Sequence, residues 1–525
     1  MISRKLSGVL MAFVFVCATV LATAEPAIVR PFERETWATP ANSVDAAVEA
    51  ILRLHGAHFR NPCSDAVFVR RVYLDMIGTL PDPAEVDAFL TSTAPNKRAA
   101  LIDTLFTRDE FADYWAMKWC DILRVKSEFP MNLWPNAAQA YHHWVRQALR
   151  DNLPYDQFAR ELLTSSGSNF RVPQVNFYRA LSAREPAAIA KGVALTFMGT
   201  RLEKWPVARA ADLATFFSRV AYKKSDEWKE EIVFNNPAPA GPLTAVLPDG
   251  TAVTIPADGD PRQTFANWLI SPQNTWFNRA VVNRIWCWTL GQGIITESDD
   301  IRADNPAASP ETLACLEREL VKSHYDLRSV YRLILNSRTY QQSSLPQGDT
   351  TDPALRFAHY TVRRLDAEVL LDALCWIGGE GVGYTSATPE PYTFVPKENR
   401  TIALADGSIT SAFLTTFGRP ARDTGLESER DNHPTDTQRL FLLNSPDIQR
   451  WISRSPRLHK IITSSLKRTT EIIRNMYLTI LSRYPTPEET LTAIQYFEAS
   501  EEEKGPTAND LAWALINSKE FLDRH

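Results

Sequence analysis

One helical face rich in aromatic residues limits what this 525-residue chain can fold into. Between residues 111 and 123, large side chains recur at i, i+3, i+4, i+7, i+8, i+11 and i+12, which is the spacing of one face of an α-helix. The residues on this face are Phe111, Tyr114, Trp115, Lys118, Trp119, Ile122 and Leu123. Such a face could grip a sugar ring or a nucleobase, but this spacing is far more typical of a packed core. We therefore predict a buried helix here and a mainly α-helical fold.

A helical-hairpin unit occurs near both ends of the chain. Residues 44–59 and residues 69–76 carry apolar side chains at helical spacing, and the second pattern stops at Gly78. Pro83 suits the first turn of the next helix, because its missing N–H would have no partner there. The same unit returns with Tyr477-Leu478, Pro485, Pro487 and Glu489 in place of Tyr73-Leu74, Pro81, Pro83 and Glu85. Distant copies separated by unlike sequence do not build a stacked solenoid, so each is expected to be a separate hairpin.

A single β-hairpin stands out from the helical patterns. Residues 243–247 and 251–255 are typical of two short strands joined by Pro248-Asp249-Gly250. Residues 235–260 are also enriched in Pro, Gly, Thr and Val, so we place a domain boundary there. The sequence predicts a mainly α, multi-domain helical protein with a small β-hairpin near residues 243–255.

The predicted domains follow from this boundary. A first helical domain covers residues 40–235, a hairpin or linker covers 236–260, and a second helical domain covers 261–525. The terminal helical-hairpin repeat lies at about residues 470–525. Residues 378–405, rich in Gly, Thr and Pro, are expected to form a long surface loop or an insertion.

The N-terminus has the order of a secretory signal peptide. Arg4 and Lys5 precede an apolar run from residue 9 to residue 21, and small residues lead to Ala24. A membrane anchor is the alternative, but the run is shorter than the roughly 20 apolar residues that span a bilayer. We predict a signal peptide at residues 1–24, cleavage after Ala24, and an exported protein located in the periplasm or outside the cell.

The net charge limits the class of partner. The formal charge of the whole chain is −5, and loss of residues 1–24, with two basic and no acidic residues, leaves 55 basic against 62 acidic residues, or −7. This acidity argues against nucleic acid as a partner. We expect other exported proteins or cell-envelope polysaccharide as partners, and no membrane association after cleavage.

The cysteines indicate neither a disulfide scaffold nor a zinc site. Five remain after cleavage, an odd number with no close pairs: Cys63, Cys120, Cys287, Cys315 and Cys375. A zinc site needs paired spacing such as Cys-x-x-Cys. We expect buried thiols with at most one or two bridges, whose pairing the sequence leaves open, and no metal or other cofactor.

Two ordered series of short motifs resemble a known pair of domains. The first series includes Arg70-Arg71-Val72-Tyr73-Leu74-Asp75, Gly78-Thr79-Leu80-Pro81, Trp144-Val145 and Asn152-Leu153-Pro154-Tyr155-Asp156. The second includes Phe277-Asn278-Arg279, Asn283-Arg284-Ile285-Trp286, Gly291-Gln292-Gly293, Asp299-Asp300-Ile301-Arg302, Arg363-Arg364-Leu365-Asp366, Phe417-Gly418-Arg419-Pro420 and Leu443-Asn444-Ser445-Pro446. Together they resemble the paired planctomycete-type domains of unknown function, a cytochrome-associated N-terminal domain followed by its C-terminal partner.

The chain departs from this family pattern at one position. Many members carry a Cys-x-x-Cys-His-type element, suited to covalent haem attachment, just after a segment similar to residues 196–202. This chain has Glu203-Lys204-Trp205-Pro206 there, with neither cysteine nor histidine. The resemblance therefore implies no haem in this chain.

No catalytic constellation is recognisable, but two polar clusters are candidate ligand-binding sites. Asp299, Asp300 and Arg302 follow a glycine-rich turn, and adjacent carboxylates can bind a cation or act as general acid and base. Arg419, Arg422 and Glu427 belong to a charged stretch, and arginines can clamp a carboxylate or sulfate. The favoured alternative is structural: the acidic loop caps a helix, and the arginines form ion pairs with Asp423, Glu427, Glu368 and the segment around Arg364.

Two hypotheses of different class remain. The first is a non-catalytic exported interaction or assembly scaffold, and the protein then has no catalytic residues. The second is an enzyme or binding protein acting on an extracytoplasmic acidic or sulfated polysaccharide. An enzyme requires the Asp299 and Arg419 clusters to share one pocket, whereas a scaffold permits them to lie apart as ion pairs.

Overall fold

The structure is a computed structural model that describes residues 28–237, 241–345, 355–464, 468–500 and 503–525. The predicted signal peptide, residues 1–24, lies outside the described residues. In the part that is described, no helix combines the length and the apolar character needed to cross a bilayer.

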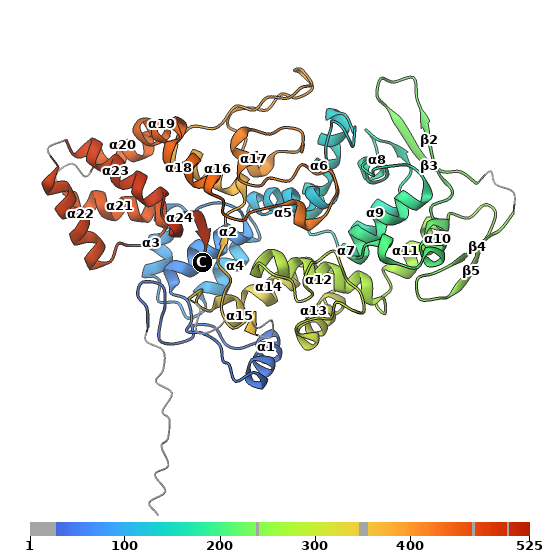
Figure 1. Ribbon diagram of the computed structural model, residues 1–525, viewed down its shortest axis with the longest axis horizontal. Coiled ribbons are helices and arrows are strands. Elements are labelled where there is room, and N and C mark those ends of the chain that lie inside the picture. The colour runs from blue at the N-terminus through green and yellow to red at the C-terminus, as the bar shows by residue number, and fades with distance from the viewer. Residues whose placement is uncertain (1–27, 238–240, 346–354, 465–467, 501–502) are drawn as a thin grey trace, which may run out of the picture.

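Helices make up 54% of the chain and strands 7%, which confirms the predicted mainly α class (Figure 1). The first ten described helices are α1 (Ser43–Leu54), α2 (Asp65–Met76), α3 (Pro83–Thr91), α4 (Lys97–Leu105), α5 (Asp109–Ile122), α6 (Pro135–Arg150), α7 (Tyr155–Thr164), α8 (Asn176–Arg179), α9 (Pro186–Met198) and α10 (Val207–Thr215). They are followed by α11 (Pro261–Leu269), α12 (Thr275–Leu290), α13 (Pro310–Lys322), α14 (Leu327–Leu335), α15 (Arg338–Gln341), α16 (Ala367–Gly378), α17 (Ala412–Thr416), α18 (Asp436–Asn444), α19 (Pro446–Arg454), α20 (Pro456–Ser464), α21 (Thr469–Leu481), α22 (Pro487–Ala499), α23 (Lys504–Ile516) and α24 (Lys519–Leu522). Short 3-10 turns are η1 (Pro173–Val175), η2 (Leu202–Lys204), η4 (Thr401–Ala403) and η5 (Glu427–Glu429).

The strands of the described residues form three small antiparallel sheets. The predicted hairpin is confirmed as β4 (Leu243–Val246) paired with β5 (Ala252–Ile255). Sequence analysis missed a second pair, β2 (Val220–Lys224) with β3 (Glu231–Asn235), to which β1 (Gly167–Ser168) adds an edge. Near the C-terminus, β7 (Asp523–Arg524) pairs with β6 (Arg363–Arg364).

The aromatic face of α5 lies in the core, as predicted. Trp115 is 1% exposed, and its ring centroid lies 4.4 Å from that of Tyr331 and 5.6 Å from that of Trp288. Trp119 contacts Trp288 and Phe158 in the same layer. Rings from α5, α7, α12 and α14 therefore stack into one buried layer, which accounts for the aromatic spacing in the sequence.

Both copies of the hairpin unit form helices in the structure, and the two copies pack against each other. Both second helices, α3 and α22, begin with proline in the first turn and with a capping box, formed by Asp82 with Glu85 and by Thr486 with Glu489. Helix α3 packs against α21 of the other copy. The helix predicted for residues 44–59 is shorter than expected: α1 ends at Leu54, and Gly56 has a φ of 69°, which turns the chain away.

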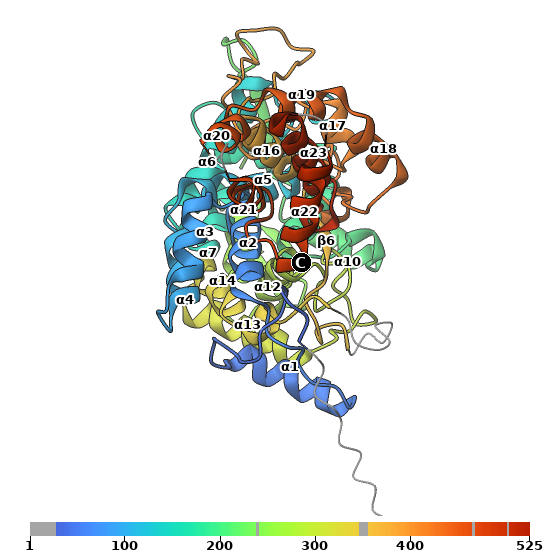
Figure 2. The same ribbon diagram turned by 90° about the vertical axis from the view of Figure 1, so that its left-hand side faces the viewer.

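Segments from both ends of the chain share one core. Helix α1 packs on α13, α9 packs on α12, and the C-terminal strand β7 lies in the middle of the molecule (Figures 1 and 2). Residues on both sides of the proposed boundary at 236–260 contribute to a single buried apolar cluster. The charged clusters lie where these two parts of the chain meet.

Candidate functional site

The acidic loop begins where α12 ends, at Gly291, whose φ of 86° closes the helix. Asp299 accepts a hydrogen bond of 2.6 Å from a guanidinium nitrogen of Arg284, which is fully buried. Arg284 also donates to the carbonyl oxygens of Leu195 and Thr196 on α9. Asp299 thus fixes the loop to the interface between α12 and α9.

Asp300 is held by two cations. Lys204 Nζ lies 2.6 Å from Asp300 Oδ2, and Arg302 Nε lies 3.1 Å from the same oxygen. Burial opposes ionisation of Asp300, but Lys204 and Arg302 lower its pKa below the ordinary value. Lys204 belongs to residues 203–206, which contain neither cysteine nor histidine and which instead supply this ion pair.

Arg419 and Arg422 are buried in ion pairs. Arg419 Nε lies 3.2 Å from Glu368 Oε1, and Arg422 Nε lies 2.9 Å from Asp121 Oδ1. The predicted pairing of this segment with Glu368 is therefore correct. Arg364 itself faces Asp523 at 2.9 Å, so the predicted tie to Arg364 is wrong, but its neighbour Asp366 lies 3.7 Å from Arg430 of the same charged stretch.

Arg430 joins these two pairs into one network. Its guanidinium lies 2.7 Å from Asp121 Oδ2 and 2.6 Å from Glu368 Oε2. Although burial raises the pKa of Glu368, the charge and hydrogen bonds of Arg430, followed by the charge of Arg419, lower it to about 2. Arg430 thus connects α5 with α16. The local sequence of these two helices does not indicate that they lie close together.

A second branch of the network centres on Asp366. Its carboxylate accepts hydrogen bonds from Lys118 at 2.8 Å and from Arg524 at 2.9 Å. Arg524 also forms an ion pair with Asp75, with its Nε 3.1 Å from Asp75 Oδ1. A guanidinium nitrogen of Arg363 lies 2.9 Å from the same oxygen of Asp75. Lys118, which the sequence placed on the aromatic face of α5, therefore contributes a charge to this network.

Asp299 and Glu427 are the members of the two clusters that meet. The backbone N–H of Glu427 donates a 2.6 Å hydrogen bond to Asp299 Oδ2. Burial and then the negative charge of Asp299 raise the pKa of Glu427, opposed by Lys118 and Arg284. Within the described parts of the chain, the Glu427 carboxylate itself accepts no hydrogen bond. Glu427, with its raised pKa beside the Asp299 carboxylate, has the character of one member of an acid–base site.

A cavity of about 360 Å³ is lined in part by Leu426, the residue that precedes Glu427 in the sequence. Its lining includes Leu426, Asp423, Arg124, Arg201 and Glu203. Asp423 forms an ion pair with Lys126 at 2.6 Å instead of one with the arginine cluster. The cavity is therefore charged, and none of the six residues singled out from the sequence lines it.

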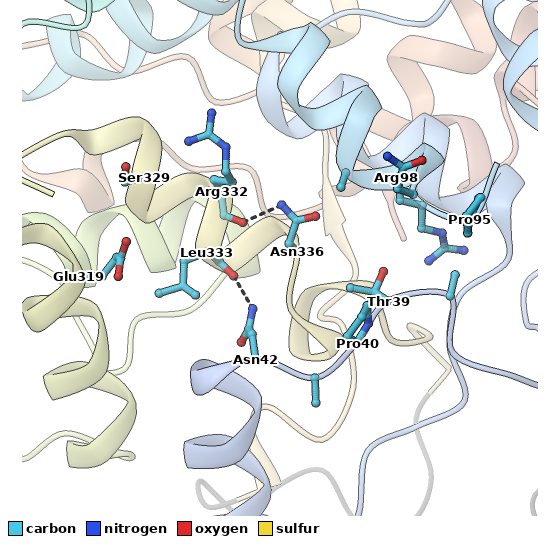
Figure 3. Close-up of a pocket in the computed structure, with 14 residues that line it drawn as sticks. Thr39, Pro40, Asn42, Pro95, Arg98, Glu319, Ser329, Arg332, Leu333 and Asn336 are labelled. Carbon is cyan, nitrogen blue, oxygen red and sulfur yellow. Dashed lines mark hydrogen bonds between the residues drawn. The ribbon is translucent and has the colours of Figure 1, made fainter. Parts of the chain in front are cut away.

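A larger cavity, of about 680 Å³, lies between the segment before α1, the start of α4, and α14 (Figure 3). Asn42 donates to the carbonyl of Leu333 at 2.9 Å, and Asn336 donates to the carbonyl of Arg332 at 3.0 Å. A guanidinium nitrogen of Arg98 lies 2.7 Å from Asp65 Oδ1, so this arginine forms an ion pair within the protein. The polar groups that line this cavity thus hold its walls together.

Metal-binding geometry is not present in the residues that the structure describes. No group of three or more His, Cys, Asp or Glu side chains among them is placed to hold an ion. In the same residues, the five predicted thiols are free cysteines.

Comparison with protein-family models accounts for most of the chain. Residues 43–220 match a model described as "Protein of unknown function (DUF1549)", and residues 261–497 match one described as "Protein of unknown function (DUF1553)". The chain belongs to the family of proteins with these paired planctomycete-type domains. No curated protein and no solved structure matched this chain. In this paired-domain protein, Asp121 lies in the first matched region, and Arg430 and Glu368 lie in the second, so the ion-pair network joins the two.

Proposed function

We propose that this paired-domain protein is an exported, non-catalytic interaction or assembly scaffold. The observation that carries the proposal is the position of Arg430, which contacts Asp121 of the first matched region and Glu368 of the second. Burying several charges is costly unless each has a partner. A network of this kind is suited to holding two helical regions in one fixed arrangement, which is what a scaffold requires.

The arginine cluster argues against a binding site for an external anion. The side chains of Arg419, Arg422 and Arg430 are almost entirely buried, and each has a carboxylate partner. A sulfated or acidic polysaccharide would have to displace these carboxylates to reach the guanidinium groups. The partners expected of the scaffold are other exported proteins or neutral components of the cell envelope.

One observation favours a second candidate function, an enzyme acting on an extracytoplasmic acidic or sulfated polysaccharide. Glu427 has a raised pKa and its backbone N–H donates to the Asp299 carboxylate, and a buried carboxyl group held beside a second one is a common arrangement for general acid and base. In this candidate Glu427 is the acid and Asp299 the base.

Two variants separate these functions. Proximity labelling in the native host should give the same set of exported partners for the wild type, Asp299→Asn and Glu427→Gln, because a scaffold does not depend on acid–base chemistry. The purified protein should leave sulfated and uronic-acid polysaccharides intact. Release of reducing ends by the wild type, lost in Glu427→Gln but kept in the exposed-site control Asp436→Asn, would establish the enzyme and overturn the scaffold.

A further inference from the structure

A third cavity, of about 620 Å³, lies between α6 and the long loop that precedes η4. Helix α6 contributes Asn136, Gln139, His142 and His143, and the loop contributes Phe394 and Asn399. No residue of the acidic loop or of the arginine cluster lines this cavity, although Arg419 and Arg422 donate hydrogen bonds to the backbone carbonyls of Asp406 and Ala405 on its wall. Its lining mixes amide, imidazole and aromatic groups.

Two buried polar side chains on this cavity have unused hydrogen-bonding atoms. His142 is 7% exposed and Asp406 is 2% exposed. In the described structure, His142 Nε2 and Asp406 Oδ2 have no partner, although Asp406 Oδ1 accepts hydrogen bonds of 2.9 Å from the backbone N–H groups of Ser127 and Ser408. Buried polar atoms without partners are rare, because each one costs free energy. These two atoms have almost no surface open to the cavity, so the hydrogen-bonding groups available to a ligand are the exposed side chains of Asn136, Gln139 and His143.

The protonation of His142 suits a neutral ligand. Burial, followed by the charges of Arg422 and Arg146, lowers the pKa of His142 to about 3, so its ring is neutral at neutral pH. A neutral imidazole offers one donor and one acceptor. Asp406 brings a formal negative charge to the cavity lining, and the guanidinium groups of Arg419 and Arg422, which donate to the carbonyls of Asp406 and Ala405, bring positive charge behind it, so the cavity favours neither anions nor cations.

Three aromatic side chains lie near residues of the cavity lining, since Trp134 precedes Asn136 by two positions, Tyr392 precedes Phe394 by two, and Trp228 contacts both rings. The ring centroids of Trp134 and Trp228 are 4.7 Å apart, and Tyr392 lies 5.6 Å from the first ring and 5.8 Å from the second. Trp228 is 62% exposed, and Phe394, on the cavity wall two residues after Tyr392, is 60% exposed. Large rings held in contact yet open to solvent are unusual unless they meet a partner.

The local backbone holds these rings in place. Trp134 has a φ of 73°, which is strained for a bulky residue, and it immediately precedes α6. The loop is tied down at Tyr384, whose hydroxyl lies 2.6 Å from that of Thr401, and its two arms touch at Gly381, where a Cβ would lie 1.8 Å from the carbonyl oxygen of Lys397. The loop and the turn between β2 and β3 both lie at the top of the molecule in Figures 1 and 2, and the contact between Tyr392 and Trp228 joins them. The rings thus have a fixed arrangement before any ligand binds.

We propose that this aromatic rim and cavity bind a neutral oligosaccharide. The C–H faces of a sugar ring pack on exposed aromatic rings, while its hydroxyl groups, each a donor and an acceptor, pair with the amides of Asn136 and Gln139 and with the imidazole of His143. A proline-rich peptide is the other ligand of aromatic grooves, but it is mostly apolar and leaves the polar wall without partners. This inference goes beyond the proposed scaffold function and does not depend on it.

Affinity gel electrophoresis tests the site with four neutral polysaccharides, namely hydroxyethylcellulose, xylan, galactomannan and laminarin, with dextran sulfate as the anionic comparison. At least one neutral polymer should retard the wild type. Phe394→Ala and Trp228→Ala should each weaken binding at least about tenfold, as expected for aromatic anchors, and Gln139→Ala should weaken it less. Because the replaced rings are exposed, the variants should melt like the wild type.

Tyr496→Ala is the matched control, since Tyr496 is 50% exposed on α22, at the opposite end of the molecule (Figure 1). Its binding should equal that of the wild type. The proposal is overturned if none of the four neutral polymers retards the protein, if dextran sulfate alone does so, or if Phe394→Ala and Trp228→Ala bind as well as the wild type. Competition by a proline-rich peptide, but not by neutral oligosaccharides, would assign the rim to peptides instead.

Discussion

Replacing Arg430 with glutamine removes the cation shared by two buried carboxylates. In the variant, Asp121 keeps its 2.9 Å contact with Arg422, and Glu368 keeps its 3.2 Å contact with Arg419. Asp121 loses its 2.7 Å contact with Arg430, and Glu368 loses its 2.6 Å contact with Arg430, which in each case is the shorter of the two. We expect Arg430→Gln to be strongly destabilised at neutral pH.

Two estimates of the loss agree. Removing one partner of a buried ion pair costs roughly 3 to 5 kcal/mol. The pKa of Glu368 is lowered from 4.5 to about 2, and at about 1.4 kcal/mol per pKa unit this shift stabilises the folded state by roughly 3 kcal/mol at neutral pH. Arg430 is the largest of the interactions that lower this pKa. A loss of about 3 kcal/mol is therefore expected for Arg430→Gln.

The sign of the pH dependence gives a second test. A carboxyl group with a lowered pKa stabilises the folded state above its ordinary pKa, and this contribution is lost as the pH falls from 4.5 towards 2. The difference in stability between wild type and Arg430→Gln should therefore be largest at pH 7 and should narrow below pH 4.5.

Urea unfolding at pH 7 and at pH 3 measures both effects. Arg439→Gln is the control, because Arg439 pairs with Asp436 on an exposed helical surface, where an ion pair contributes at most about 1 kcal/mol. If the free energy of unfolding of Arg430→Gln equals that of the wild type at pH 7, or if the difference between the two does not change with pH, then Arg430 does not stabilise the fold through its ion pairs with Asp121 and Glu368.

Three further predictions concern single sites. Trp115→Ala should cost roughly 3 to 5 kcal/mol in urea unfolding, because a buried ring surrounded by other rings is truncated; an unchanged melting temperature with loss of ligand binding would contradict its place in the core. Glu427→Gln should be at least as stable as the wild type at pH 7, because a carboxyl group whose pKa is raised above 4.5 destabilises the folded state once it ionises; a less stable variant at pH 7 would refute this, and the difference should vanish below pH 4.5. N-terminal sequencing of secreted protein should begin at Glu25, and an intact Met1 on cytoplasmic protein would reject the predicted export.

Local patterns in the sequence predicted the helical parts of this fold well. The face of residues 111–123 and the helix start at Pro83 depend on neighbours within a few residues, so spacing and capping chemistry are sufficient to find them. Strands β2 and β3 were missed because they are short, carry Lys223, Lys224 and Glu231, and are joined by a charged turn, which hides the alternation of a strand.

The candidate site could be predicted only in part. Sequence reasoning selected Asp299 and Glu427, which do meet, and paired Arg419 with Glu368 correctly. It missed Asp121 as the partner of Arg422 and Arg430, since these residues are about 300 positions apart in the chain. It also assigned Lys118 to an apolar face, because spacing alone does not reveal that Asp366 lies opposite. Such partners are fixed by the packing of helices that are distant in sequence.

Thermal melts of wild type and Arg419→Gln, with and without sulfate or an acidic oligosaccharide, test whether the arginine cluster is internal to the fold. Arg419 and Glu368 are both buried, so Arg419→Gln should melt at a lower temperature than the wild type. Sulfate stabilises most folded proteins to some degree, so a shift of equal size in both proteins counts as no binding. We expect equal shifts with sulfate and none with the oligosaccharide. An anion-dependent rise in the wild type that is absent from a variant of unchanged stability would show that the cluster binds an external ligand.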